Sequence, residues 1–206
     1  SMPDNRNLHR NVFFRDCAKV PDYPFSSLDS TRPTELWNWM DAQRKAGNEL
    51  LAISHNANVS DGWMYPVDVD NTTGRPIDAA WAAARDRNER LVEIKQGKGQ
   101  SETHPLLSPN DEFAGFELWD YTLSADSLRP THREGSYVRR ALLDGLLLSS
   151  KGKGNPFKYG FIGDTDTHNA AASNEEFNFT GKFAFENNAR ERLTGIPGAP
   201  AGQIQQ

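Results

Sequence analysis

Residues 42–53 read AQRKAGNELLAI, and residues 83–94 read AARDRNERLVEI. Each segment closes a helix-like pattern, passes through a short polar turn and enters an apolar run typical of a buried strand. Because the two segments look alike, we interpret them as one helix–turn–strand unit that the chain uses twice. Helices that alternate with short apolar strands indicate an α/β domain with a parallel sheet and helices outside it.

A third unit of the same kind follows, so residues 1–206 are interpreted as one domain. The expected elements are helix 33–46 with strand 50–53, helix 77–90 with strand 91–94, and helix 136–148 with strand 159–162. Residues 1–30 show no periodicity and are expected to be irregular, and residues 195–206 are expected to form a flexible tail. Long loops, at 54–76, 95–135 and 164–185, should follow the strands, and loops of that length are usually functional or disordered.

Composition excludes several classes of protein. A length of 206 residues allows one sizeable core, and the net charge of −5 argues against nucleic acid as the main partner. No apolar run is long enough for a membrane span. A single cysteine, Cys17, excludes an intrachain disulfide and a Cys-based zinc site. The N-terminal residues carry no signal-peptide pattern, and the sequence assigns no cellular compartment.

The strongest chemical pattern is FIGDTDTHN at residues 161–169. In an extended chain, alternate residues point the same way, so Asp164, Asp166 and His168 can converge. Carboxylate oxygen and imidazole nitrogen suit zinc, manganese or iron. We expect Asp166 and His168 to be metal ligands. Asp164 is a further ligand, a group that orients an imidazole, or part of a turn that bonds its own backbone.

Other polar residues lie at the ends of the expected strands, where sites gather in parallel α/β folds. His55 follows strand 50–53, and we expect it to be a metal ligand, although a lone histidine is more often a loop cap. Glu93 lies inside strand 91–94, where it faces either the site or a half-exposed surface. Three basic residues on the loops, Arg75, Lys95 and Lys98, can hold an anionic substrate or remain solvated.

These residues resemble the PHP superfamily of metal-dependent phosphoesterases, named for polymerase and histidinol phosphatase. The chain is most similar to large bacterial proteins of unknown function that carry a PHP-like domain. The matching segments are ISHNANVS at 53–60, LVEIKQGKGQSE at 91–102, DEFA at 111–114, SYVR at 136–139 and NPFKYGFIGDTDTHN at 155–169. The last of them is the most specific.

The resemblance implies a distorted β/α barrel with two or three metal ions at the strand ends. It implies that His55 is a ligand and that Asp166 with His168 is the closing Asp-x-His pair. PHP proteins open with a His-x-His motif, which this sequence lacks. We therefore expect a partial barrel that corresponds to the C-terminal half of the domain, with an open sheet edge that a homo-oligomer could cover.

Two functional hypotheses follow. In the first, the chain is a metal-dependent hydrolase that uses Mn, Zn or Fe on a small phosphoester-like anion, with Asp164 and Glu93 as candidate catalytic carboxylates. We expect this fragment to be inactive or weakly metal-bound alone, since the N-terminal ligands are missing. In the alternative, it is a non-catalytic remnant that binds a ligand or a protein through the loops at 56–70 and 110–121.

Overall fold

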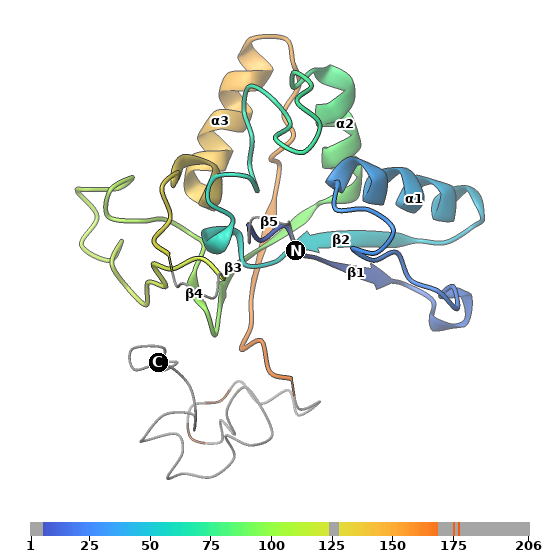
Figure 1. Cartoon of the computed structure of the whole chain (residues 1–206), viewed down its shortest axis with the longest axis horizontal. Helices are drawn as coiled ribbons and strands as arrows, with labels where there is room; N and C mark the ends of the chain where they lie inside the picture. Colours follow the sequence, from blue (N-terminus) through green and yellow to red (C-terminus); the bar gives the residue numbers. More distant parts are fainter. Residues whose placement is uncertain (1–5, 124–127, 169–174, 176, 178–206) are drawn as a thin grey trace.

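The computed structural model describes residues 6–123, 128–168, 175 and 177, and shows a mixed α/β fold. Helices lie along one side of a five-stranded sheet (Figure 1). In chain order the elements are β1 (Arg10–Phe14), α1 (Pro33–Lys45), β2 (Leu50–Ser54), α2 (Ala79–Asn88), β3 (Leu91–Gln96), β4 (Gly99–Gln100), α3 (Val138–Ser150) and β5 (Gly160–Gly163). Short 3-10 turns occur at Cys17–Lys19, Ala57–Val59 and Glu134–Ser136.

The centre of the sheet is parallel. Strand β3 pairs in parallel with β2 on one side and with β5 on the other. Two antiparallel strands are added to this centre: β1 pairs with β2, and β4 folds back on the end of β3. The β2–α2–β3 and β3–α3–β5 connections are crossovers between neighbouring parallel strands, and their usual right-handedness places both helices on one face. The described strands form an open sheet, not a closed barrel, with β1 and β5 at its outer edges.

The predicted helix–strand units are confirmed, with ends that differ from the expected ones by a few residues. The helix expected at 77–90 is shorter. It begins at Ala79 because the Asp78 carboxylate accepts a hydrogen bond from the Trp81 amide at 2.8 Å, while Ile77 is buried in the core. Within the described residues, no helix is long and apolar enough to cross a bilayer.

The expectation that residues 1–30 are irregular was wrong, because they contain β1. The register pairs Arg10 with Ser54 and Phe14 with Leu50. This short, half-exposed strand is stabilised by a partner that comes much later in the chain, which a local sequence pattern does not reveal. The tail expected at 195–206 lies outside the described residues.

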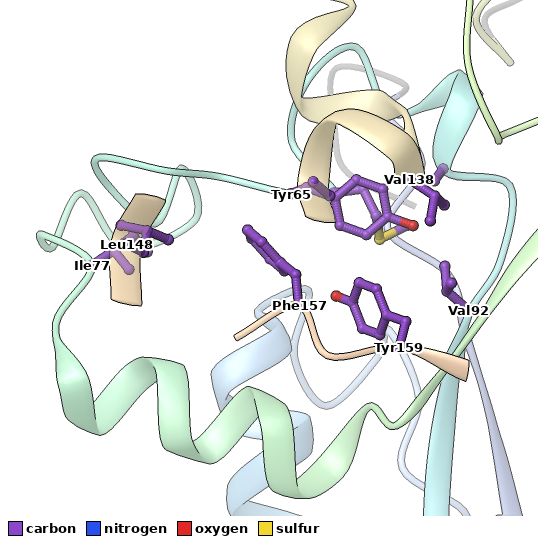
Figure 2. Close-up of a cluster of buried hydrophobic side chains, with 10 residues drawn as sticks. Tyr65, Ile77, Val92, Val138, Leu148, Phe157 and Tyr159 are labelled. Atoms are coloured by element: carbon purple, nitrogen blue, oxygen red, sulfur yellow. The ribbon is translucent and has the colours of Figure 1, made fainter. Parts of the chain in front are cut away.

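The core lies between the helices and the sheet in two clusters. One gathers the rings of Tyr65, Phe157 and Tyr159 with aliphatic side chains such as Val92 and Val138 (Figure 2). The ring centroids of Tyr65 and Phe157 lie 5.8 Å apart in an edge-on arrangement, which aromatic pairs favour. The second cluster packs α1 against β2 and includes Leu36, Trp37, Met40, Leu50 and Ala52.

A buried charge network joins the two clusters. The Glu89 carboxylate is completely buried and lies 2.9 Å from Arg10 Nε and 2.9 Å from Arg85 Nη2. It also accepts hydrogen bonds from Trp37 Nε1 and Ser54 Oγ, each at 2.8 Å. Burial alone would raise the pKa of Glu89, but the charges and hydrogen bonds of these partners outweigh burial and lower the pKa to about 2. Glu89 is therefore ionised inside the protein and ties α2 to α1, β1 and β2.

Candidate functional site

A cavity of about 680 Å³ opens beside the carboxyl end of β2. One wall comes from residues 8–12, at the start of β1, and a second from the segment 25–33, which leads into α1. His55 and Asn56, directly after β2, lie between these walls and Lys98, Asp166 and His168. The cavity thus brings together segments from both ends of the described chain.

His55 is held by Glu93. The imidazole Nδ1 lies 2.6 Å from Glu93 Oε2, and the other carboxylate oxygen accepts a hydrogen bond from the Asn56 amide at 3.2 Å. Both side chains are largely buried, with 13 % of His55 and 7 % of Glu93 exposed. Because a carboxylate can only accept, His55 donates from Nδ1, and its Nε2 faces Asp166 Oδ1 at 3.8 Å. Carboxylates orient metal-binding histidines in this way.

Asp166 is the centre of a second group of contacts. Its Oδ1 lies 3.1 Å from His168 Nε2, while its Oδ2 forms an ion pair with the Lys98 ammonium. The Asp166 side chain is 9 % exposed and that of His168 is 51 % exposed. Imidazole nitrogens from two histidines therefore face one oxygen of Asp166, and a cation occupies the other oxygen.

The structure does not bring Asp164 to the cavity. Its carboxylate is exposed and accepts a hydrogen bond from the Thr165 amide at 2.7 Å, which is the turn arrangement weighed from the sequence. The alternation expected for residues 164–168 fails because Asp166 has a left-handed backbone, with φ of 58°. An extended chain was assumed, and one αL residue changes the direction of the side chains that flank it.

Only one of the three basic residues singled out from the sequence, Lys98, lies at the cavity. Lys98 lines the cavity, as the anion-binding prediction requires. Lys95 instead forms an ion pair with Glu117, with Nζ and Oε2 2.5 Å apart. Arg75 is exposed and lies in a turn, where its backbone carbonyl accepts a hydrogen bond from the Asp70 amide. Neither Arg75 nor Lys95 lines the cavity.

Among the polar residues of the cavity that were not singled out from the sequence, His9 and Asn56 lie closest to His55 along the β1–β2 ends. His9 lies beside His55, with ring centroids 6.4 Å apart and planes within 10° of parallel. Partial removal from water, with nearby positive charges that include Lys98 and Arg10, lowers the pKa of His9 below its usual value. Asn56 is buried, has φ of 56°, and its side-chain oxygen has no hydrogen-bond partner among the described residues. Recognising β1 and its pairing with β2 would have revealed His9.

The donor chemistry of these residues fits a divalent metal. Imidazole nitrogens of His55 and His168, with the Asp166 carboxylate, form the mixed nitrogen and oxygen set that zinc, manganese and iron accept. Within the described part of the chain, no three His, Cys, Asp or Glu side chains are arranged so that they could hold a metal ion. The ion pair of Lys98 with Asp166 provides the positive charge that a metal ion would otherwise supply.

Comparison with known families identifies the family of the chain. The model of the family described as "Protein of unknown function (DUF3604)" matches residues 1–202, and the chain therefore belongs to the DUF3604 family. No curated protein and no solved structure matches the chain significantly.

Proposed function

We propose that this DUF3604-family chain is a metal-dependent hydrolase domain that acts on small phosphoester-like anions. The convergence of His55, Asp166 and His168 on one cavity carries the proposal. These residues follow two different strands, β2 and β5, which both run parallel to β3. Ligand-type side chains gathered at the carboxyl ends of parallel strands are the usual arrangement of an α/β active site.

The side chains have distinct roles in this proposal. His55 and His168 present Nε2, and Asp166 presents Oδ1, toward one point. A divalent ion held there, Mn, Zn or Fe, supplies a Lewis acid that lowers the pKa of water. Glu93 does not touch that point. It is a positioning residue that keeps the proton of His55 on Nδ1 and leaves Nε2 for the ion.

The cavity suits a small, polar, anionic substrate. Lys98 lies at the edge of the ligand cluster, where its ammonium can contact an anionic oxygen of the substrate as well as Asp166. The wall across the cavity is rich in hydroxyl groups and carries one guanidinium, contributed by Ser26, Ser27, Ser30, Thr31 and Arg32. A volume of about 680 Å³ is in the range of small-molecule sites.

We further propose that the open sheet is part of a PHP-like β/α barrel. The sheet has free edges at β1 and β5, and Phe161 on β5 is 52 % exposed. Further barrel strands, or a second copy of the chain, would cover such an edge and remove its unpaired backbone groups from solvent. Sedimentation velocity tests the second arrangement, since a monomer at all concentrations would contradict self-association.

One observation favours the alternative of a non-catalytic binding site. The Lys98–Asp166 ion pair already neutralises the carboxylate, so the cavity can bind a polar ligand without a metal. The two loops expected to carry such binding, 56–70 and 110–121, differ in the exposure of their aromatic side chains. Tyr65 belongs to the core, whereas Phe113 and Phe116 are 72 % and 64 % exposed.

Metal content tests the main proposal. The purified chain is incubated separately with Mn, Zn and Fe, and bound metal is measured by elemental mass spectrometry. We expect Asp166→Asn to lose bound metal and Asp164→Asn to retain it, because only Asp166 lies in the cavity. A screen of phosphoesters with the metal-loaded chain follows. Equal metal content in the wild type and both variants would contradict the assignment of Asp166 as a metal ligand. The non-catalytic, metal-free binding site would then be the remaining hypothesis.

A further inference from the structure

We propose that His9 binds the same metal ion and is a ligand contributed by the N-terminal strand. The inference rests on the proposed function, since it adds a residue to that metal centre. His9 lines the cavity together with His55, Asp166 and His168. It precedes β1 by one residue, in a part of the chain with no His-x-His motif.

The β1–β2 pairing places His9 at the site. The last registered pair of this ladder joins Arg10 to Ser54, and the hydrogen bond from the His55 amide to the His9 carbonyl, at 3.1 Å, extends it by one step. His9 and His55 are therefore directly opposite each other at the end of the two strands. Opposed residues in an antiparallel pair point to the same face, which explains the near-parallel rings 6.4 Å apart.

The backbone around His9 is fixed on both sides. Asn7 is buried, and its side-chain amide donates to the carbonyls of His55 and Asn56, at 2.9 and 3.2 Å. Arg10 donates from Nε to Glu89 and from Nη1 to the Leu8 carbonyl, at 2.9 and 2.7 Å. These contacts hold the segment against β2 before any ligand arrives. A site held in this way by surrounding hydrogen bonds is preorganised.

The imidazole of His9 is available for binding. Neither of its ring nitrogens has a hydrogen-bond partner among the described residues. The residue is exposed, and it lines the cavity. A histidine on a fixed backbone, parallel to a second histidine and unused by the fold, has the properties of a metal ligand. An ordinary surface histidine requires neither the fixed backbone nor the position opposite His55.

Cobalt binding tests this assignment directly. Co²⁺ is titrated into the wild type, His9→Ala and His132→Ala, and the visible absorption and dissociation constant are measured. We expect His9→Ala to weaken Co²⁺ binding by at least about 10-fold and to change the absorption band. Loss of a residue that only supports a metal ligand already lowers metal affinity by about 10-fold or more. His132→Ala should match the wild type, since that side chain is 72 % exposed on a loop outside the cavity. Circular dichroism checks that each variant is folded.

The outcomes separate the two proposals. Wild-type protein that binds no Co²⁺ overturns the metal centre and the role of His9 together. Cobalt binding with the same constant and spectrum in His9→Ala overturns only the role of His9. For a second readout, His9→Gly is titrated with and without free imidazole. Return of the wild-type absorption band on addition of imidazole supports ligation by His9, and a band that imidazole does not change contradicts it.

Discussion

Single residues in this cavity act through pairs. The sequence presented His55 and Glu93 as separate and ambiguous candidates, one in a loop and one in a strand. The structure joins them by a 2.6 Å contact, so the orientation of the histidine depends on the carboxylate. The same carboxylate fixes the Asn56 amide and with it the turn that follows β2.

The Glu93→Gln variant tests this dependence. Glutamine keeps the size of the side chain but can present its NH₂ group to His55 Nδ1, which favours the tautomer with the proton on Nε2. We expect the affinity for metal to fall by about 10- to 100-fold, as measured by isothermal titration. Glu49→Gln is the control, because Glu49 is exposed and, among the residues that the structure describes, its carboxylate forms an ion pair with Arg15 at the surface, away from the cavity. Equal affinities in both variants would remove Glu93 from the site.

The limits of sequence reasoning are clear at this scale. The position of Asp166 and His168 beside the cavity could be predicted, because they follow a recognisable strand and match a specific motif, whereas their role as metal ligands stays a prediction. Asp164 was placed with them only by assuming an extended backbone, and the left-handed conformation of Asp166 was not visible in the sequence. The Lys95 and Lys98 partners, Glu117 and Asp166, lie on distant segments, so their separation into a surface pair and a cavity pair depended on tertiary contacts.

Among the elements, α3 contains a glycine that packing requires. Gly145 lies in the middle of this helix, and a Cβ added there would lie 2.2 Å from Asn155 Oδ1 and 3.2 Å from Phe157 Cβ. Because glycine has no Cβ, the segment with Asn155 and Phe157, which precedes β5, can pack closely against the helix. Helix propensity alone would predict that alanine stabilises this position by about 1 kcal/mol.

We expect the opposite result for Gly145→Ala. The added methyl group has no space, so the free energy of unfolding should fall by about 1–3 kcal/mol, measured by urea denaturation. Ser149→Ala, at an exposed position of the same helix, should leave it unchanged or raise it slightly. A Gly145→Ala protein as stable as the control variant would show that Asn155 moves aside without cost.

The helices and strands themselves were predicted better than the pairing between strands. Helical and apolar periodicity identified α1, α2 and α3 and the three parallel strands, because each pattern is local. Strand β1 was missed because RNVFF is short and its only strong signal is pairing with β2. The omission also concealed His9, so an error about one strand became an error about the site.

For the molecule as a whole, the buried network around Glu89 makes stability depend on acid, because the pKa of this carboxyl is lowered far below its ordinary value. Its folded-state pKa of about 2 is below the ordinary value of 4.5 for a glutamate, so the unfolded chain binds this proton first as the pH falls. The stabilisation is complete above about pH 4.5 and is lost progressively toward pH 2. We expect roughly 3 kcal/mol of unfolding free energy to disappear over that window, measured by denaturant titration at several pH values.

Removing the charge at neutral pH tests the same network. Glu89→Gln leaves Arg10 and Arg85 facing a neutral amide in a dry interior, where breaking an ion pair costs about 3–5 kcal/mol. Thermal denaturation at pH 7 should show a large loss, and the dependence on pH between 4.5 and 2 should become shallower than in the wild type. Retention of wild-type stability would mean that the two arginines do not need the charge. Sequence reasoning assigned no role to this pair, because Arg85 and Glu89 look like an ordinary surface pair of a helix.

The cavity residues come from both early and late parts of the chain, and this sets when the site can form during synthesis. A chain emerging from the ribosome presents His9, His55 and Glu93 early, but Asp166 and His168 come only after β5, the last strand that the structure describes. Until β5 has paired with β3, the carboxylate that faces both histidines has no fixed place. Nascent protein that ends before residue 168 therefore lacks part of this constellation, and the proposed metal ion could bind only after translation has passed that residue.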